Sequence, residues 1–564
     1  LNHKDPENPL LTGYVSPTQE FLRRYSQESN SKDLALWSEV FEEQYDEAQE
    51  VAVAESNFVG WNSSYTGEPL AIEQMQEWRD GTIEQILSLK PKHLLEVGCG
   101  TGLLLFAYAP HCDSVHATEL SFGAMNAVQQ ELDKRQWQHV ELTQGDALNM
   151  SAIAGKEFDT IVINSVAQYF PNPQYLEQVI ENLLPHLAEG GKLFLGDIRN
   201  LDIYHAHLAM VEQCHLTKSI SVDEFNSRIQ RRIQQEPELL ISPSFFKSLE
   251  ANHSSIGKVD IVAKRGVGNN EMLRYRYEAI LTKGPQVQQD SPIQWHAFDS
   301  LESIKALLED GRSASFGVSG VPNQRLTTDM ALMQGLAEWK GAKLIHPQQG
   351  ADQFSTCTQS KLVQLEQLLS FAQDLGYQAN LTWSQDDVAS LDLVFSKDNT
   401  AKIEAKAPYR ASELLNYPRL DVVGLKLTDR LNAALAEVLP AYMLPTSYTA
   451  LPQLPLTASG KVNKRVLPQP VSNGVSHDEL VAPSNEVETK LCAIWQTLLH
   501  VEQVGVTDNF FSLGGHSLLA TRLVSAVRAA FNKELTLAEI FAKPTIAEIA
   551  PALADVAEQE VLPQ

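Results

Sequence analysis

The segment at residues 93–102, with the sequence HLLEVGCGTG, constrains the fold of this chain more than any other. Its first five residues form an apolar run that predicts a buried strand, and the residues from Leu103 onward predict a helix. Three alternating glycines between them permit a tight turn and let the backbone approach a ligand closely. This arrangement is typical of a nucleotide-type binding loop, although tight turns in unrelated folds also match it.

The spacing of these glycines argues against a dinucleotide cofactor. A dinucleotide fingerprint would have its third glycine one position later, where Leu103 stands. Its strand also would not usually end in an acid, as this one does at Glu96. A dehydrogenase is therefore kept only as a distant alternative.

Strand and helix patterns alternate regularly after the loop. Strands are expected at 93–97, 114–120, 140–143, 159–164 and 192–197, with helices at 122–135 and 173–187. A helical insertion at 202–235 and two antiparallel-looking strands at 258–264 and 273–282 follow. This alternation predicts a parallel, doubly wound sheet with its ligand at the carboxyl ends of the strands.

Two acids stand at the ends of expected strands, in register with the glycine loop. Glu119 closes the second strand about 20 residues after the loop, where a carboxylate can accept both hydroxyls of a ribose. Asp146 lies where the edge of an adenine is expected. A single acid after a strand can be a helix cap or a solvated residue, but the two acids and the loop together favour a cofactor site.

The regions on either side of this alternation are harder to interpret. A short strand at 9–17 is isolated and needs a partner elsewhere, and the helical periodicity at 19–56 and 70–89 predicts a cover for the sheet. The aromatic loop at 58–67 is either a packed turn or a cap over the cofactor. Residues 285–405 suggest a small second α/β unit, whose closing strand pair leads us to interpret it as a half-copy without a site.

Length and composition limit the classes of protein to be considered. With 564 residues the chain is too long for one core, and about three or four domains are expected. A formal net charge of −27 argues against a nucleic-acid or anionic-membrane partner, because both would be repelled. No apolar run approaches ~18 residues, so no membrane span is predicted. The chain begins with Leu1 rather than methionine, which suggests a piece of a longer polypeptide.

The cysteines indicate a cytoplasmic protein. All five are scattered, and their spacing is not that of metal ligands, which argues against disulfides and structural zinc. They are Cys99, Cys112, Cys214, Cys357 and Cys492.

Three segments together resemble a module of a non-ribosomal peptide synthetase. Segment 508–517, DNFFSLGGHS, resembles the signature of a peptidyl carrier protein, which implies that Ser517 receives phosphopantetheine. Its place at a helix start suits a phosphodiester, although a serine there can also be a simple cap. Segment 439–468 resembles the C-terminal subdomain of an adenylation domain, where the lysine at Lys461 contacts adenylate. No large adenylation core is recognised in the sequence, so Lys461 is expected to be solvated.

The first half of the chain resembles the class I S-adenosylmethionine-dependent N-methyltransferases that are embedded in the adenylation C-terminal subdomains of these synthetases. The stretches that carry the resemblance are 60–65, 96–102, 164–170, 196–199 and 236–246. An embedded position implies that residues 10–15 belong to the adenylation subdomain, and that they pair with or pack against residues after 420.

The resemblance implies a multidomain α/β protein. Its parts are a Rossmann-like methyltransferase with a mostly parallel seven-stranded sheet and a helical N-terminal cover, a small α+β adenylation C-terminal subdomain, and a helical-bundle carrier domain. The expected boundaries are 1–17 for the first strand of the adenylation subdomain, 18–284 for the methyltransferase, 285–410 for an accessory α/β region, 411–468 for the rest of the subdomain, 469–483 for a linker, and 484–564 for the carrier.

The resemblance also implies the residues of the site. Those expected to bind S-adenosylmethionine are Tyr65, Glu96, Gly98, Gly100, Gly102, Glu119, Leu120, Asp146, Ala147, Asn164 and Ser165. Asn164, Ser165, Gln168 and Tyr169 are expected to position the nucleophile, and the candidate proton acceptors are His207, Glu236 and Glu238, each of which can equally be an ordinary lid residue. Asp197 and Arg199 can form a structural ion pair.

The expected reaction is a direct displacement in which a neutral amine of an aminoacyl thioester takes the methyl group and S-adenosylhomocysteine is released. An α-amine has a reference pKa near ~8, so a strong base is not obligatory. Expected partners are the adenylation core, neighbouring synthetase domains and a phosphopantetheinyl transferase. The alternatives are methylation of oxygen or carbon, and a docking and carrier platform with an inactive methyltransferase.

Overall fold

The computed structural model describes the chain between residues 11 and 553, apart from gaps. The longest gaps are 23–56, 286–292, 348–355, 398–413, 419–426 and 468–480. Most of the helical cover expected at 19–56 and most of the linker expected at 469–483 therefore lie outside the described residues. None of the helices in the described part of the chain is both long and apolar enough to cross a membrane.

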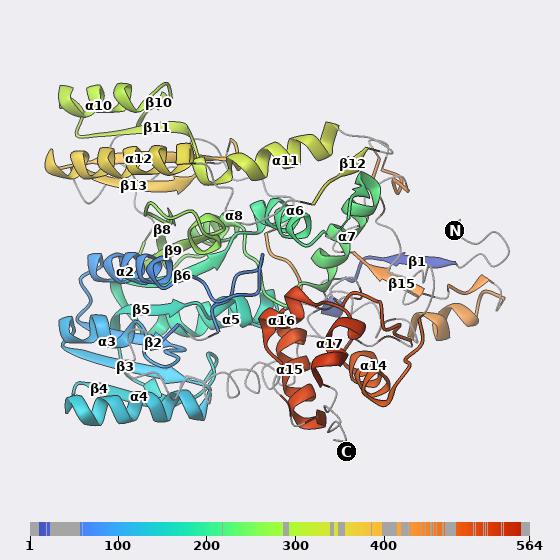
Figure 1. Cartoon of the computed structure of the whole chain (residues 1–564). Helices are drawn as coiled ribbons and strands as arrows, with labels where there is room; N and C mark the ends of the chain where they lie inside the picture. Colours follow the sequence, from blue (N-terminus) through green and yellow to red (C-terminus); the bar gives the residue numbers. More distant parts are fainter. Residues whose placement is uncertain are drawn as a thin grey trace, which may run out of the picture.

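A seven-stranded sheet forms the centre of the largest unit, with the strand order β4-β3-β2-β5-β6-β9-β8 (Figure 1). The strands from β4 to β6 are parallel, and β9 and β8 are antiparallel to their neighbours. The predicted mostly parallel sheet is confirmed. Its strands are β2 (His93–Val97), β3 (Ser114–Glu119), β4 (Val140–Gln144), β5 (Phe158–Asn164), β6 (Leu187–Arg199), β8 (Ile256–Ala263) and β9 (Arg276–Lys283).

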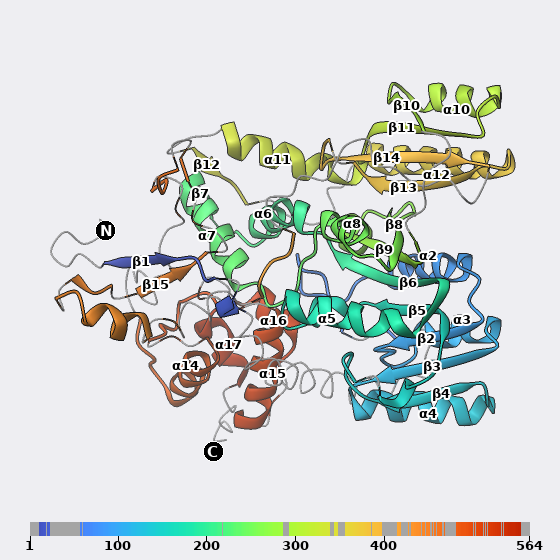
Figure 2. The same ribbon diagram turned by 180° about the vertical axis from the view of Figure 1, so that it is seen from behind.

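Helices cover both faces of this sheet, which explains why the strands read as continuous apolar runs. One face carries α2 (Ile72–Ser88), α3 (Leu105–Tyr108) and α4 (Phe122–Arg135), and the other carries α5 (Pro173–Leu183) and α8 (Pro243–Asn252) (Figure 2). The insertion after β6 contains α6 (Tyr204–Cys214), β7 (Ile220–Ser221) and α7 (Val222–Gln235).

Some expected boundaries are wrong for identifiable reasons. The strand expected from residue 273 begins only at Arg276, because the side chain of Asn270 caps the short helix α9 (Glu271–Arg274) by accepting hydrogen bonds from the N–H groups of Met272 and Leu273. The strand expected from 192 begins at Leu187, which pairs with Phe158 of β5.

Residues 293–396, which we call the accessory unit, contain a second, smaller sheet. Its strand order is β10-β11-β14-β13, and it confirms the expected second α/β unit. The first strand and helix of this unit were not expected from the sequence. Its elements are β10 (Gln294–Ala297), α10 (Leu301–Asp310), β11 (Ser315–Pro322), α11 (Thr327–Glu338), β12 (Leu344–Ile345), α12 (Thr356–Asp374), β13 (Gln378–Trp383) and β14 (Ser390–Ser396).

The accessory sheet repeats the topology of one half of the large sheet, as the half-copy interpretation requires. In both, two parallel strands joined through a helix precede an antiparallel pair that adds in reverse order, β5-β6-β9-β8 and β10-β11-β14-β13. Both second strands carry an irregularity with a left-handed residue, Asp197 at φ 61° and Gly320 at φ 77°. Each is followed by an asparagine, Asn200 or Asn323, that caps a single helical turn.

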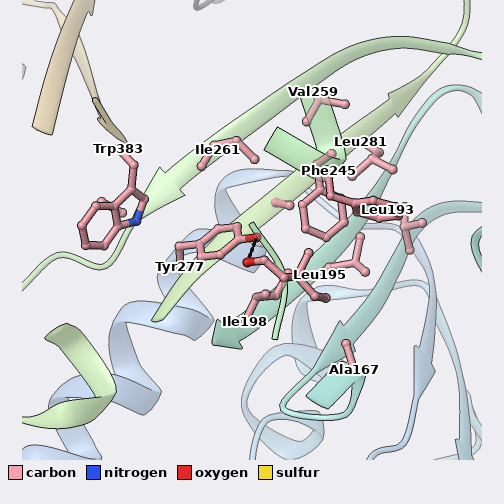
Figure 3. Close-up of a cluster of buried hydrophobic side chains, with 14 of the residues drawn as sticks. Ala167, Leu193, Leu195, Ile198, Phe245, Val259, Ile261, Tyr277, Leu281 and Trp383 are labelled. Atoms are coloured by element: carbon pink, nitrogen blue, oxygen red, sulfur yellow. Dashed lines mark hydrogen bonds between the residues drawn. The ribbon is translucent and has the colours of Figure 1, made fainter. Parts of the chain in front are cut away.

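The two sheets share one hydrophobic core. Figure 3 shows Trp383 of β13 beside Ile261 of β8, in a cluster that continues through Tyr277 and Phe245. The Tyr277 hydroxyl donates to the carbonyl of Ile241 at 3.0 Å. The accessory unit is therefore packed onto the seven-stranded sheet through apolar side chains.

The isolated first strand pairs with a strand from the later part of the chain, as expected. Strand β1 (Thr12–Val15) pairs in parallel with β15 (Ser447–Ala450), so the predicted pairing of residues 10–15 with residues after 420 is confirmed. Of the helix expected at 428–438, residues 430–436 are helical, and Lys461 is exposed.

Four helices near the C-terminus pack around Leu491, Trp495 and Phe510 and confirm the expected helical bundle. They are α14 (Glu486–Leu499), α15 (Ser517–Phe531), α16 (Leu537–Ala542) and α17 (Ile546–Leu553). Ser517 is the first residue of α15.

Candidate active site

The glycine loop lies at the carboxyl ends of β2 and β3. Gly98, Gly100 and Gly102 all have positive φ angles, of 77°, 54° and 90°, a region that other residues rarely adopt. The N–H groups of Gly98 and Cys99 donate to the carbonyl of Thr118, at 2.8 and 3.0 Å. The loop is thereby held against β3.

Glu119 joins this loop to the end of β3. One of its carboxylate oxygens accepts the N–H of Gly100 at 2.8 Å, and the other accepts those of Leu120 and Ser121 at 2.8 and 2.9 Å. The N–H of Gly145 donates to the Glu119 carbonyl at 3.0 Å, which places Asp146 and Ala147 beside the same strand end. The structure thus brings together the expected ribose and adenine residues.

Asp146 also has a local role. One oxygen of its carboxylate accepts the N–H groups of Leu148 and Asn149, at 2.8 and 3.0 Å, as in a capped turn. This capping is the alternative considered for a lone acid, and it orders the backbone where an adenine is expected.

Glu96 is a buried acid beneath the loop. Its side chain accepts a hydrogen bond from the Tyr108 hydroxyl. Burial raises the pKa of Glu96 to about 7, and the neighbouring charge of Glu119 acts in the same direction, whereas the Tyr108 hydroxyl opposes it. A carboxyl group of this kind is partly protonated near neutral pH.

We expect Glu96→Gln to raise the melting temperature of the unit built on the seven-stranded sheet at about pH 8, but not at about pH 5. A carboxyl whose folded pKa of about 7 exceeds the unfolded value of 4.5 stabilises the fold fully below pH 4.5, and this contribution is lost as the pH rises through 7. The loss is at most roughly 3 kcal/mol, and glutamine avoids it. Calorimetry measures the melting temperatures of wild type and Glu96→Gln between about pH 5 and pH 8. If the two melting temperatures differ by the same amount at every pH, the raised pKa of Glu96 is contradicted.

Asp197 is the centre of a buried network at the end of β6. It accepts hydrogen bonds from the Trp78 indole at 2.8 Å, from the Ser165 hydroxyl at 2.9 Å, and from the Arg276 guanidinium. Asp197 is fully buried, with a φ of 61°. The ion pair suggested between Asp197 and Arg199 is wrong, because Arg199 lies two residues further along the strand and pairs elsewhere.

The Arg199 guanidinium binds two acids of the insertion. It donates to Glu236 at 3.0 Å and to Glu238 at 2.6 Å, and the Tyr204 hydroxyl also donates to Glu236. Burial is the main cause that raises the pKa of Glu236, against the opposing effect of Arg199. These contacts favour the interpretation of Glu236 and Glu238 as structural residues.

Three buried polar side-chain atoms in this region have no hydrogen-bond partner within the described part of the chain. They are Asn164 Oδ1, Gln168 Oε1 and His207 Nε2. Asn164 ends β5, and its Nδ2 donates to the Ser165 hydroxyl at 2.9 Å. Gln168 belongs to the 3₁₀ turn Ala167–Tyr169 directly after it, and His207 lies on α6, which follows the end of β6.

The His207 ring is kept neutral. Burial, reinforced by the charges of Arg199, Arg274 and Arg276, holds the pKa of His207 well below its usual value. The ring stacks on that of Tyr275, with centroids 4.3 Å apart, and its Nε2 is 3.8 Å from a Glu271 oxygen. His207 is therefore a neutral ring, with one nitrogen that carries a proton and one that accepts a hydrogen bond.

Tyr65, from the aromatic loop at 58–67, also lies beside Tyr275. Its hydroxyl lies 2.9 Å from that of Tyr275. Phe58 and Trp61 of this loop pack against Met75, Trp78, Met272 and Leu273. The loop is a packed turn, as one alternative held, and it also places Tyr65 at the edge of the sheet.

Tyr169 is a neutral side chain in this region. Burial raises the pKa of Tyr169 above its usual value, so its phenol stays neutral.

Sequence reasoning missed several residues of this site. Glu271 and Arg274 belong to α9, Tyr275 follows it, and Arg276 is the first residue of β9. An antiparallel strand starts at the edge where its parallel neighbour ends, which brings these residues to the site. The polar and aromatic run just before the expected strand was the available signal. For Asp329, which binds Tyr275, no comparable signal exists in the sequence.

Comparison with family models and known proteins supports two of these units. Residues 95–193 match the model described as a methyltransferase domain, and residues 489–553 match that of a phosphopantetheine attachment site. The chain is similar to chondramide synthase cmdD of Chondromyces crocatus, with 36% identity over 97% of this chain and 14% of that protein. It is also similar to the probable non-ribosomal peptide synthetase CymA of Salinispora arenicola, with 31% identity over 94% of this chain and 7% of that protein.

A third relative is cyclosporin synthetase simA of Tolypocladium inflatum, with 28% identity over 88% of this chain and 3% of that protein. The chain thus spans a small part of the length of these relatives. Among solved structures, the N-methyltransferase NodS of Bradyrhizobium japonicum with S-adenosyl-L-homocysteine is 18% identical, with a TM-score of 0.27, over 36% of this chain and 87% of NodS.

Proposed function

The chain belongs to the non-ribosomal peptide synthetases, as a region with a methyltransferase domain and a phosphopantetheine carrier domain, and on this premise we propose that it N-methylates an aminoacyl group. The aminoacyl group is held as a thioester on phosphopantetheine at Ser517, and the methyl donor is S-adenosylmethionine. Relatives whose names include cyclosporin and beauvericin synthetases support a role in peptide synthesis.

The residues around the glycine loop fit the proposed cofactor. Gly98 and Gly102 allow the loop to turn tightly, because a Cβ there would lie 2.5 Å from the Val166 side chain and 2.3 Å from that of Phe106, and the Glu119 carboxylate suits ribose hydroxyls. Leu120, Asp146 and Ala147 follow the neighbouring strand ends, on the adenine side. S-adenosylmethionine, when bound, supplies an electrophilic methyl group.

The observation that carries the choice of nitrogen is the set of buried atoms Asn164 Oδ1, Gln168 Oε1 and His207 Nε2. The two amide oxygens accept hydrogen bonds, as does one ring nitrogen of a neutral histidine, and buried acceptors without a partner are costly. A neutral primary amine has two N–H groups, which would satisfy two of these acceptors and leave the nitrogen lone pair to be aimed at the methyl carbon. Alignment of this kind is the main contribution a protein makes to a displacement by an already neutral amine.

Proton release then needs no strong base. As the nitrogen–carbon bond forms and the carbon–sulfur bond breaks, one proton leaves the nitrogen for water. The neutral His207 accepts a hydrogen bond from the amine, because its low pKa disfavours the protonated ring. Methylation of oxygen or carbon would call for a base, and the acids Glu236 and Glu238 are engaged by Arg199.

The segments outside the methyltransferase support its placement within an adenylation domain. We propose that residues 1–17 and 411–468 form an adenylation C-terminal subdomain, with residues 18–284 and 285–410 inserted into it and residues 469–483 linking it to the carrier at 484–564. The parallel pairing of β1 with β15 supports this, since it joins residues from the two ends of the insertion. The adenylation core, neighbouring synthetase domains and a phosphopantetheinyl transferase are the partners that this arrangement requires.

The proposal is tested by loading the carrier directly. Aminoacyl-coenzyme A and a phosphopantetheinyl transferase place an aminoacyl arm on the full chain, S-adenosylmethionine is added, and fragment mass spectrometry locates the methyl group. We expect one methyl group on the backbone nitrogen.

A matched α-hydroxyacyl arm, in which oxygen replaces the nitrogen, is the control and is expected to remain unmodified. Methylation of this arm, or methyl groups on a side chain, would overturn the nitrogen assignment. If the chain binds neither S-adenosylmethionine nor S-adenosylhomocysteine, it would be an inactive docking platform.

A further inference from the structure

Helix α11 of the accessory unit lies next to the methyltransferase site. It packs against α6, with Leu332 and Leu336 in the same apolar cluster as Leu208. In the repeated topology, α6 follows the end of β6 and α11 follows the end of β11, so the two helices are equivalent elements of the two sheets. One carries His207 and the other carries Asp329, both close to Tyr275.

Asp329 is fully buried and holds two residues of the strand edge. Its carboxylate accepts a hydrogen bond from the Tyr275 hydroxyl, and it pairs with the Arg274 guanidinium at 3.4 Å. Arg274 is itself 1% exposed and also donates to the Tyr275 hydroxyl at 3.2 Å. The orientation of the Tyr275 phenol is therefore determined by a residue of the accessory unit.

This contact sets the direction of the next hydrogen bond. The single proton of the Tyr275 hydroxyl is donated to Asp329, so the hydroxyl of Tyr65, 2.9 Å away, must be the donor to Tyr275. With its proton used in this way, the Tyr65 oxygen offers only lone pairs to the site. The Tyr65 oxygen is thus a hydrogen-bond acceptor, like the unpartnered atoms Asn164 Oδ1 and Gln168 Oε1.

Side chains of the accessory unit bind the loop that leads into α9, and these contacts fix the position of α11. Arg325, just before α11, donates to the carbonyls of Gly268, Lys264 and Gly266 at 3.0, 3.2 and 2.6 Å. These carbonyls belong to the loop that leads into α9, directly before Arg274 and Tyr275. On the same loop, Glu366 of α12 binds the Arg265 side chain at 2.8 Å and the Gly266 N–H at 2.9 Å.

We propose that Asp329 is a positioning residue for methyl transfer, which fixes the direction of the hydrogen-bond chain from Tyr65 through Tyr275 and so holds Tyr65 as an acceptor for the substrate amine. This inference rests on the proposed function, in which the nucleophile is an amine that has N–H groups to be oriented. It assigns to the accessory unit a part in building the acceptor side of the site.

Tyr275→Phe is the most direct test, because it removes one hydroxyl and leaves the Arg274–Asp329 pair in place. We expect kcat with the aminoacyl-loaded chain to fall roughly tenfold, while the Kd for S-adenosylhomocysteine stays within about twofold of wild type. Tyr65→Phe is expected to have a similar effect, and the double variant to be no slower than either single variant, since the two hydroxyls act as one chain. Asp329→Asn is expected to lower kcat as well, since its amide can donate to Tyr275 and reverse the chain.

The matched control is Glu366→Gln, which weakens the same interface away from Asp329. We expect it to lower the melting temperature slightly and to leave kcat unchanged. The wild-type product reports separately on the proposed function, which fails if its methyl group is not on nitrogen. If wild type methylates nitrogen but Tyr275→Phe retains its rate, or Glu366→Gln is equally slow, the positioning role of Asp329 is overturned.

Discussion

Ser517→Ala is expected to abolish methylation of the chain itself. Alanine has no hydroxyl to form the phosphodiester, so incubation with coenzyme A and a phosphopantetheinyl transferase should leave its mass unchanged. Without the arm no aminoacyl thioester is presented, and no methylated product forms on the protein. The methyltransferase domain has its own core, so the Kd for S-adenosylhomocysteine should stay within about twofold of wild type.

Two controls make this result specific. Ser525→Ala removes another serine from α15, whose hydroxyl donates to the Thr521 carbonyl at 3.4 Å, and this variant should be loaded and methylated normally. A free aminoacyl-pantetheine thioester should restore product formation by Ser517→Ala, although more slowly, since tethering supplies a high effective concentration. Uptake of phosphopantetheine by Ser517→Ala would show that another residue carries the arm.

Glu119→Gln is expected to weaken binding of S-adenosylhomocysteine about a hundredfold, or about 2.7 kcal/mol. Both oxygens of the Glu119 carboxylate accept backbone N–H groups, those of Gly100, Leu120 and Ser121. A glutamine amide replaces one of these oxygens by a donor, so at least one N–H group loses its acceptor. The loop is then no longer held in its binding conformation, and the ribose hydroxyls lose a charged acceptor.

Titration calorimetry with S-adenosylhomocysteine measures this effect. Glu131→Gln provides the matched control, since it removes a carboxylate from α4 that binds Arg135 at the surface at 2.8 Å. It should bind the ligand like wild type. A Kd for Glu119→Gln within about threefold of wild type would place the ribose elsewhere.

Much of the fold could be predicted because the rules that govern it are local. The continuous apolar runs of β2 and β5 indicated strands covered on both faces, and the alternation with helices indicated a parallel sheet. The helix boundary at α9 could not be read in this way. There the cap formed by Asn270 competes with a strand-like pattern over the same residues.

The arrangement around the glycine loop could be predicted from the sequence, whereas the network around Asp197 could not. The glycine loop and Glu119 lie within about 20 residues of each other and follow a backbone rule that ties spacing to position. Asp197, by contrast, binds Trp78 from far earlier in the chain and Arg276 from far later. No spacing rule selects such partners, which is why the ion pair between Asp197 and Arg199 was wrong.

The sequence by itself determined the nucleotide-type loop, the acid at the end of β3, the order along the chain of the seven strands of the large sheet, and the serine that opens α15. Each of these depends on backbone conformation over a few neighbouring residues, which side-chain identity controls directly. Only the tertiary structure decided that Arg199 binds Glu236 and Glu238, and that Asp329 of the accessory unit holds Tyr275. Those choices depend on which buried polar groups packing brings within reach of each other, because each must then find a partner away from water.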